Sequence, residues 1–288
     1  VEFCKGSLPA GYSLAGLKIV LDCANGATYN AAPKVFKELG AQVITMANTP
    51  NGFNINEQCG STHMDAVRAR VVEEKADLGI ALDGDGDRVL LVDANGEIVD
   101  GDEIVYIIAR YRQQTGQGCN GVAGTQMSNL GLEIALRDLG IPFQRTKVVD
   151  RYVVEALKEN GWILGGEASG HILCSDLNTT GDGLVSALQV ILALRESGIP
   201  LSELKAGMQK LPQTMINVRL SEKVAIDDNK AINSAVAAAE KELGDRGRVL
   251  LRPSGTEPLI RVMAEGEDQD LVRRQVEAIA KIVEQQVG

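Results

Sequence analysis

Short apolar runs that alternate with amphipathic segments restrict the fold of this chain more than any other feature of its sequence. Residues 17–22, 42–46 and 78–82 are apolar runs of strand length, and such runs predict buried strands. Residues 63–75 place apolar side chains three and four positions apart, which predicts a helix with one buried face. A chain in which strands and helices alternate favours an α/β fold, with helices on both faces of a sheet.

The same layout occurs twice, and a smaller pattern follows it. Residues 1–98 form the first pattern, which ends with a hairpin signal at Asn95-Gly96. Residues 99–212 form the second, and residues 213–288 have the strands and helices of a compact α+β domain. We therefore expect two consecutive three-layer α/β/α domains with mixed sheets, and a small C-terminal α+β domain.

Composition excludes several classes of partner. The formal net charge of −10 argues against nucleic acid, because a phosphate backbone is bound by a basic surface. No apolar run approaches the roughly 20 residues that span a membrane. The five cysteines are far apart and form no C-x-x-C pair, which argues against a disulfide framework and for a cytoplasmic protein.

The start at Val1, without Met or a signal-peptide pattern, predicts that the chain is part of a longer protein.

Residues 83–88, Asp-Gly-Asp-Gly-Asp-Arg, directly follow an apolar strand and are called the aspartate loop here. In an extended loop every second side chain points the same way, so Asp83, Asp85 and Asp87 are expected to converge on one cation. Ligands that are all oxygen suit Mg²⁺, which keeps coordination positions open for phosphate oxygens.

An EF-hand and an acidic turn are the two other interpretations of the aspartate loop. An EF-hand fails, because its glycine position holds Arg88 and its twelfth position holds Ala94 in place of Glu. An acidic turn between two strands stays open, although a solvated turn does not need three Asp residues at alternate positions.

Residues 166–171 are called the sugar loop. Glu167, Ser169 and His171 place a carboxylate, a hydroxyl and an imidazole at alternate positions between glycines. Such groups suit sugar hydroxyls, which both donate and accept hydrogen bonds. An ordinary glycine-rich loop with a buried core histidine is the other interpretation.

Residues 252–261 are called the phosphate loop. Arginine binds phosphate with two parallel hydrogen bonds, while hydroxyls and backbone N–H groups take the remaining oxygens. A hairpin with incidental polar residues is the alternative, and no Walker P-loop motif occurs. The three loops together offer a metal site, a polyol site and a phosphate site, as phosphoryl transfer on a sugar requires. The phosphate-binding candidates are Arg252, Ser254, Gly255, Thr256 and Arg261.

In this order, the three loops resemble those of the α-D-phosphohexomutase superfamily. The stretches 20–27, 75–81 and 150–153 resemble more specifically the bacterial phosphoglucosamine mutases. The resemblance covers essentially the whole chain, and the D-G-D-G-D-R and R-P-S-G-T-E-P motifs are its most specific parts.

The resemblance implies an enzyme that interconverts glucosamine 6-phosphate and glucosamine 1-phosphate through a bisphosphate, for amino-sugar nucleotides and cell-wall precursors. It implies that Mg²⁺ lies between the three aspartates and a phosphoserine, with a phosphorylated hexosamine as substrate. The sugar and phosphate loops would bind that substrate in one cleft shared by all three domains. Arg88 and Arg151 are expected to line this cleft.

Two departures from the family pattern matter. The family's nucleophilic serine lies in a Thr/Ser-Ala-Ser-His-Asn-Pro type of loop in its first domain, and no such motif occurs here. The chain is therefore expected to lack that domain and to be inactive without it. The family usually has Gly where Val149 stands, so a positive φ there would strain the backbone.

Competing functions remain after this comparison. A phosphomannomutase or phosphoglucomutase of the same superfamily is the nearest enzyme, and a non-catalytic phosphosugar-binding module is the alternative from another class. The oligomeric state of the full-length protein is left open.

Overall fold

A computed structural model describes residues 1–220, 229–254 and 257–287 of the chain. They form two compact units, of which the first contains residues 1–128 and 132–208, and the second residues 129–131 and 209–288. Both units combine helices and strands, and the predicted fold class is confirmed.

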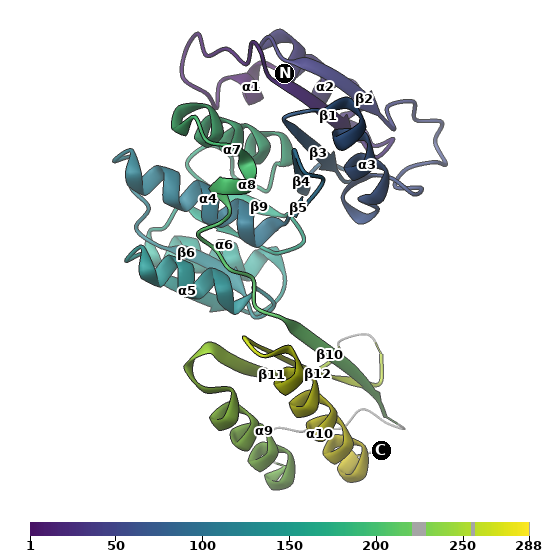
Figure 1. The fold of residues 1–288 in the computed structure, drawn as a ribbon, viewed down its shortest axis with the longest axis vertical. Coiled ribbons are helices and arrows are strands. Elements are labelled where there is room, and N and C mark those ends of the chain that lie inside the picture. Colours follow the sequence, from purple (N-terminus) through teal and green to yellow (C-terminus); the bar gives the residue numbers. More distant parts are fainter. Residues whose placement is uncertain (221–228, 255–256, 288) are drawn as a thin grey trace. The chain divides into compact units, whose positions relative to one another are not determined.

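The first unit contains a five-stranded mixed sheet in the order β2-β1-β3-β4-β5 (Figure 1). Strand β1 runs parallel to β2 and β3, whereas β4 and β5 are antiparallel to their neighbours. All five residues of β3 are buried, as a central strand requires. The strands are β1 (Lys18–Asp22), β2 (Gln42–Met46), β3 (Leu78–Leu82), β4 (Val89–Asp93) and β5 (Ile98–Val99), and the helices that pack on this sheet include α2 (Ala31–Glu38) and α3 (Asp65–Glu74).

A second sheet of this unit repeats the same neighbour pattern. Its order is β7-β6-β8-β9, with β6 parallel to both β7 and β8, and β9 antiparallel to β8. The hairpin β3–β4 in the first sheet therefore corresponds to the hairpin β8–β9 in the second. The strands are β6 (Val122–Thr125), β7 (Phe143–Thr146), β8 (Leu164–Gly166) and β9 (Ile172–Cys174), with α5 (Leu130–Asp138) following β6 and α6 (Asp150–Asn160) packed on the sheet.

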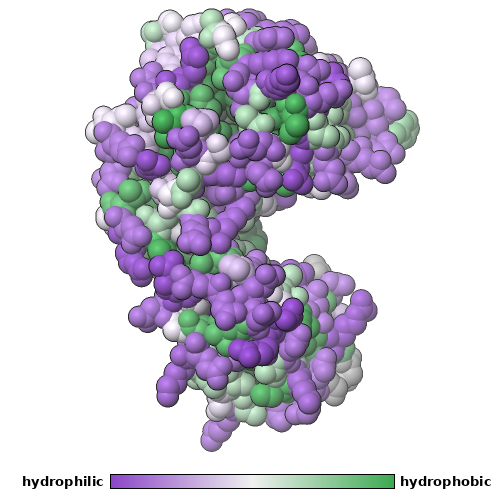
Figure 2. All heavy atoms as spheres, in the orientation of Figure 1, coloured by the Kyte–Doolittle hydropathy of each residue, from purple (hydrophilic) through white to green (hydrophobic). Residues whose placement is uncertain are grey.

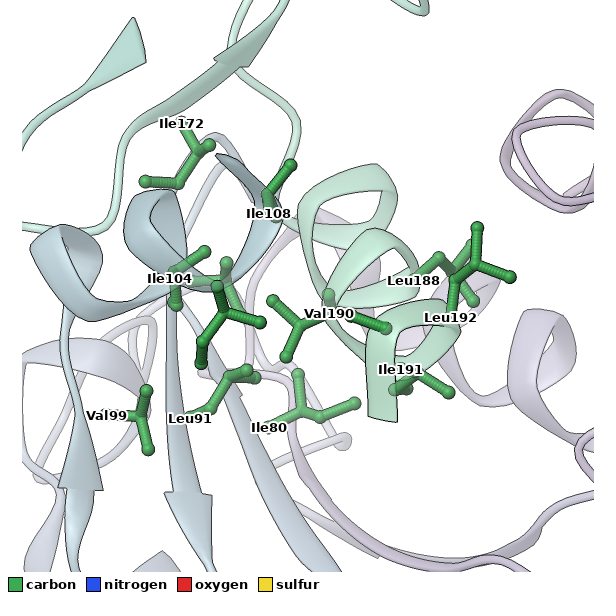
Figure 3. Packing of buried hydrophobic residues seen from close by; sticks show 14 of the residues in the cluster. Ile80, Leu91, Val99, Ile104, Ile108, Ile172, Leu188, Val190, Ile191 and Leu192 are labelled. Atoms are coloured by element: carbon green, nitrogen blue, oxygen red, sulfur yellow. The ribbon is translucent and has the colours of Figure 1, made fainter. Parts of the chain in front are cut away.

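Helices α4 (Gly101–Gln114) and α7 (Gly183–Ser197) contact strands of both sheets. Figure 3 shows Ile80 and Leu91 of the first sheet packed beside Ile104 of α4 and Val190 of α7. All four side chains are fully buried. One hydrophobic core thus extends to both sides of the predicted boundary at 98/99, and the predicted boundaries at 98/99 and 212/213 stay a prediction.

Side-chain caps fix where these two helices begin. Asp100 accepts a hydrogen bond from the Glu103 backbone N at 3.1 Å, and the Glu103 carboxylate accepts one from the Asp100 N at 2.9 Å. This reciprocal pair is a capping box. At the start of α7, Asp182 Oδ1 accepts from the backbone N of Leu184 and of Val185, both at 3.0 Å. Both helix starts lie next to the loops described below.

The second unit is a three-stranded antiparallel sheet, in the order β10-β12-β11, with two helices on it (Figure 1). Its core is separate and aliphatic, with Val218, Ile260, Val262 and Val276 at most 2% exposed. The elements are β10 (Gln213–Arg219), α9 (Lys230–Leu243), η3 (Gly244–Arg246), β11 (Gly247–Pro253), β12 (Leu259–Gly266) and α10 (Gln269–Val287).

The remaining elements are short, and the face of the molecule in Figure 2 is mostly polar. On the face shown in Figure 2, hydrophilic residues predominate and apolar ones are scattered in small groups. Within the described ranges, no helix has the length and apolar character that crossing a bilayer demands. The short elements are α1 (Glu2–Lys5), η1 (Ala27–Tyr29), η2 (Gly60–Thr62) and α8 (Leu201–Leu204).

Candidate functional site

The aspartate loop connects β3 to β4, so its ends are fixed by two paired strands. One ligand oxygen from each of Asp83, Asp85 and Asp87 lies within 4.8 Å of the other two. Among the described residues, no other group of three or more His, Cys, Asp or Glu side chains is as close. The predicted convergence of three carboxylates is therefore present in the structure.

Hydrogen bonds within the protein hold this loop in shape. Asp83 Oδ1 accepts from the backbone N of Gly86 and of Arg88, both at 3.1 Å. The Gly86 carbonyl accepts from the Gly183 N at 2.9 Å, at the first residue of α7. The Gly84 carbonyl accepts from the Ala27 N at 2.8 Å, in the loop after β1. Hydrogen bonds within the loop and from two other segments thus fix the backbone that carries the aspartates.

The carboxylates of the aspartate loop repel one another. The pKa of Asp83 is raised to about 6, chiefly by burial. A hydrogen bond with Asp87 and the charges of Asp87 and Asp85 also raise it, whereas the hydrogen bond from the Arg88 backbone lowers it. Such a group keeps its proton to a higher pH than an ordinary aspartate does, and a bound cation would favour its charged form. The donor set is all oxygen and preformed, so the residues fit a hard divalent ion such as Mg²⁺.

The sugar loop lies directly beside the aspartate loop. The Val89 N donates to the Gly170 carbonyl at 3.0 Å, and Arg88 forms an isolated antiparallel bridge with His171. His171 Nδ1 lies 3.0 Å from Asp87 Oδ2. The structure therefore brings these two predicted loops together within the first unit.

Glu167 and Ser169 are the accessible groups of the sugar loop. Ser169 is exposed and its hydroxyl donates to Glu167 Oε2 at 3.3 Å, while Glu167 is half-buried. The Gly101 N at the start of α4 donates to the Ala168 carbonyl at 3.0 Å. The loop thus presents a carboxylate and a hydroxyl as a hydrogen-bonded pair on a fixed backbone.

Arg88 and Arg151 are both exposed. Arg88 Nε lies 3.9 Å from Asp87 Oδ1, next to the carboxylate cluster. Arg151 lies in the first turn of α6, where its Nε is 3.5 Å from Glu155 Oε1 and its guanidinium is 4.8 Å from the centre of the Tyr152 ring. Weak surface ion pairs of this kind leave an arginine available to an anionic ligand.

Val149 has a positive φ, the conformation that would strain this residue where the family usually has Gly. Its φ is 119° and its ψ is 131°, and its N donates to Glu167 Oε1 at 3.4 Å. A β-branched residue is strained in this region, by about 1–3 kcal/mol. The strain therefore lies at a residue that contacts the sugar loop.

Val149→Gly is expected to stabilise the first unit by about 1–2 kcal/mol, because relief of strain exceeds the entropy that glycine adds to the unfolded chain. Urea denaturation followed by the fluorescence of Trp162, the one tryptophan of the chain, measures the change. Val72→Gly is the matched control, since Val72 is also 53% exposed but lies in the α3 helix. It should destabilise by about 1 kcal/mol. Equal losses in both variants would contradict the argument.

In the second unit, Arg252 and Arg261 lie opposite each other on β11 and β12. The Nε atoms of both are buried and have no hydrogen-bond partner within the described part of the chain. Burial lowers the pKa of Arg252, and the charge of Arg261 lowers it further. Like charges at directly opposed positions destabilise a sheet. A bound anion would offset this repulsion, so the pair is a candidate phosphate site.

Ser254 has a structural contact in the same loop. It is 7% exposed, its N donates to the Leu259 carbonyl at 2.8 Å, and its hydroxyl accepts from the Glu257 N at 3.3 Å. Gly255 and Thr256 lie outside the described residues. Because the phosphate loop belongs to the second unit, its convergence with the other two loops stays a prediction.

A polar segment before α7 also belongs to the site, and the sequence interpretation missed it. A cavity of about 320 Å³ lies against the aspartate loop and reaches this segment. The available signal was the polar run Asn178-Thr179-Thr180-Gly181-Asp182 ahead of a long apolar helix. The cavity is lined by Thr28, Asp85, Gly86, Asp87, Asn178, Thr180, Gly181, Asp182 and Leu184.

Comparison with known proteins agrees with this arrangement. Three sequence models of one family match in order: phosphoglucomutase/phosphomannomutase alpha/beta/alpha domain II at residues 10–96, domain III at residues 100–211, and the C-terminal domain at residues 215–282. The chain therefore belongs to the phosphoglucomutase/phosphomannomutase family.

Within the family, the chain is similar to curated phosphoglucosamine mutases. The chain is 62% identical over 284 residues to the phosphoglucosamine mutase of Hahella chejuensis, which covers 99% of this chain and 64% of that protein. It is 56% identical over 283 residues to the phosphoglucosamine mutase of Teredinibacter turnerae, which covers 98% of this chain and again 64% of the relative. The chain thus spans somewhat less than two thirds of the length of these relatives.

Solved structures support the fold. A phosphoglucomutase/phosphomannomutase family protein from Burkholderia thailandensis matches with a TM-score of 0.80 at 23% identity, over 100% of this chain and 64% of that one. The Aspergillus fumigatus N-acetylphosphoglucosamine mutase, in complex with GlcNAc-6P and magnesium, matches with a TM-score of 0.78 at 20% identity, over 97% and 68%. At these identities the likeness concerns the fold alone.

Proposed function

We propose that this chain provides the metal, sugar and phosphate loops of a phosphoglucosamine mutase. Such an enzyme interconverts glucosamine 6-phosphate and glucosamine 1-phosphate through the 1,6-bisphosphate. The observation that carries the proposal is the direct pairing of the aspartate loop with the sugar loop, through Val89 with Gly170 and Asp87 with His171. The 62% identity to the Hahella chejuensis enzyme supports the choice of substrate.

Asp83, Asp85 and Asp87 would hold Mg²⁺, and the magnesium in the Aspergillus fumigatus complex supports this choice of metal. When bound, the ion would compensate the negative charge on phosphoryl oxygens during transfer. The protein's own contribution is preorganisation. Because the loop backbone is held by Gly183 and Ala27, the carboxylates need little rearrangement to bind the ion.

Glu167 and Ser169 would bind adjacent hydroxyls of the hexosamine, one as an acceptor and the other as a donor and acceptor. Their hydrogen bond to each other would exchange for bonds to the sugar. Arg88 and Arg151 would add positive charge near the transferred phosphoryl group. Arg252 and Arg261 would hold the phosphate at the other end of the substrate, with Ser254, Gly255 and Thr256 supporting it.

The phosphoryl donor would be a phosphoserine outside these 288 residues. The donated group forms a bond to a sugar oxygen, and the serine recovers a phosphoryl group from the other oxygen of the bisphosphate, so phosphate is conserved over the cycle. After the first transfer and before the second, the bisphosphate must therefore reorient in the active site, so that its other phosphate faces the serine. We place the enzyme in the cytoplasm, in the synthesis of amino-sugar nucleotides for cell-wall precursors.

The test extends this chain with the part of the Hahella chejuensis relative that the match does not cover. We expect the extended chain to convert glucosamine 6-phosphate when primed with the bisphosphate, and the unextended chain to bind it without turnover. Calorimetry measures binding, and a coupled assay of glucosamine 1-phosphate measures turnover.

Competing substrates and controls separate the alternatives in this experiment. Faster turnover of mannose or glucose phosphates would favour a phosphomannomutase or phosphoglucomutase. Binding of phosphosugar by the extended chain without any turnover would favour a non-catalytic module. A further extended chain, in which the added nucleophilic serine is replaced by alanine, controls for background activity.

A further inference from the structure

His171 is one of two histidines in the chain, and the two have opposite environments. His63 is exposed, whereas the side chain of His171 is 7% exposed and lies directly before β9. Its Nδ1 lies 3.0 Å from Asp87 Oδ2. Its Nε2 is buried and has no hydrogen-bond partner in the described part of the chain.

The imidazole ring is held in place by its surroundings. A Cβ atom at Gly181 would lie 2.4 Å from Cε1, 2.5 Å from Nε2 and 2.8 Å from Nδ1 of His171. Only glycine therefore leaves room for the ring in this position. Two residues on, the Gly183 N donates to the Gly86 carbonyl of the aspartate loop. The segment before α7 thus fixes both the ring and the backbone of the loop.

This burial is unsuited to direct contact with a sugar. A group that recognises sugar hydroxyls needs an accessible polar atom, and Glu167 and Ser169 provide such atoms in the same loop. The Nδ1 atom of His171 lies against Asp87, and its Nε2 atom is buried. For a hydrogen bond between an imidazole and a carboxylate, Nδ1 must carry the proton and donate it.

A donor at Asp87 Oδ2 has a direct consequence for the metal site. Three carboxylates that repel one another tend to swing apart, and each lost orientation weakens cation binding. Partners of this kind orient metal ligands, and their loss commonly weakens metal affinity 10- to 100-fold. Anchoring Oδ2 of Asp87 limits the rotation of the carboxylate, which lies in the cluster with Asp83 and Asp85.

We propose that His171 is a positioning residue for the metal site, which orients Asp87 through Nδ1 and does not contact the sugar. The inference rests on the proposed Mg²⁺ site, and it changes the role that the sequence suggested for this histidine. It also assigns a role to Gly181, which keeps space for the ring.

The test titrates the unextended chain with Mg²⁺ alone by calorimetry, without any sugar phosphate. His171→Ala should weaken Mg²⁺ binding about 10- to 100-fold. His171→Asn should restore the affinity to within about threefold of the original chain, because its side-chain nitrogen takes the place of Nδ1 and donates to Asp87. His171→Gln should not, because its nitrogen reaches the place of Nε2.

Further variants separate positioning from folding. Gly181→Ala should weaken Mg²⁺ binding to a similar degree, because its methyl group displaces the ring from Asp87, and it leaves the imidazole itself unchanged. His63→Asn is the control for the chemical exchange and should have no effect. Thermal unfolding in EDTA shows whether each variant is folded before it is titrated.

The outcomes distinguish this inference from the proposed function. If His171→Ala binds Mg²⁺ as the original chain does but binds glucosamine 6-phosphate more weakly, His171 contacts the sugar and the inference is wrong. If His171→Asn is as weak as His171→Ala, the hydrogen bond is not the cause and the inference is also wrong. If the original chain binds no Mg²⁺, the metal site fails, and the inference fails with it.

Discussion

Asp85→Asn is expected to weaken Mg²⁺ binding at least about 100-fold, a loss of about 3 kcal/mol, and to leave the metal-free chain at least as stable as before. The side chain of Asp85 is exposed, so its packing contributes little. One of its carboxylate oxygens, however, lies within 4.8 Å of an oxygen of Asp83 and of Asp87. Removing it takes away one metal ligand and one source of repulsion together, which makes the two effects opposite in sign.

Calorimetry gives the affinity, and thermal unfolding in EDTA and in excess Mg²⁺ gives the stability. The original chain should gain stability with Mg²⁺, as ligand binding to the folded state requires, and Asp85→Asn should gain little. Asp65→Asn is the matched control, because Asp65 is a fully exposed aspartate in the first turn of α3. If Asp85→Asn is destabilised and binds Mg²⁺ with normal affinity, the metal site is wrong and the loop is an acidic turn.

The pH dependence of the same titration provides an internal check. The pKa of Asp83 is raised from its usual 3.8 to about 6, mainly by burial. Between pH 3.8 and about pH 6 the folded, metal-free chain therefore holds a proton that the unfolded chain has lost. The contribution of this group to stability is fully present below pH 3.8 and is lost as pH rises through about 6. Mg²⁺ needs the deprotonated carboxylate, so its affinity should rise between pH 5 and pH 7 and level off above.

Local patterns predicted the aspartate loop well. Its apolar strand, Leu78–Leu82, has the predicted bounds, and the alternation of Asp and Gly gave the convergence of three carboxylates. The hairpin at Asn95-Gly96 is also present, with Gly96 at a φ of 82°. In these cases the information lies within a few consecutive residues, so a periodicity or a turn rule is sufficient.

The sugar loop shows where local patterns fail. Strand β8 was missed because two of its three residues are glycine, which is depleted in strands. Its partner β9, which has only three residues, was missed with it. The structure explains them by close packing: a Cβ at Gly165 would lie 2.7 Å from the Ala123 carbonyl oxygen, and one at Gly166 would lie 2.9 Å from Ile172 Cδ1. Partners distant in sequence set these requirements, and no local pattern encodes them.

The same limit applied to His171, whose partner Asp87 lies 84 positions away in the sequence. Alternation along the loop grouped it with Glu167 and Ser169 as one set. Burial separates His171 from the other two, and burial depends on the segment before α7. The positive φ of Val149, by contrast, was anticipated from the glycine that the family has at this position.

The phosphate loop gives the second large effect. Arg252→Met is expected to weaken binding of inorganic phosphate and of glucosamine 6-phosphate about 10- to 100-fold, as the loss of a charged hydrogen-bonding group does. It should also stabilise the ligand-free second unit, because Met keeps the aliphatic part of the side chain and removes the like charge opposite Arg261. Both arginines have a buried Nε atom without a partner among the described residues, which is the contact that an anion would supply.

Thermal unfolding with inorganic phosphate, against chloride of equal ionic strength, isolates the anion effect from general screening. Arg273→Met is the matched control, because Arg273 is an exposed arginine of α10 in the same unit that pairs with Asp270. Arg273→Met removes the same charge at a position outside the pair of arginines on β11 and β12. It should therefore leave phosphate binding unchanged and should not stabilise the second unit. If Arg252→Met lowered the stability of the ligand-free unit and phosphate stabilised it as before, the two arginines would be packing residues of the sheet. The phosphate site would then have to be sought elsewhere in the second unit.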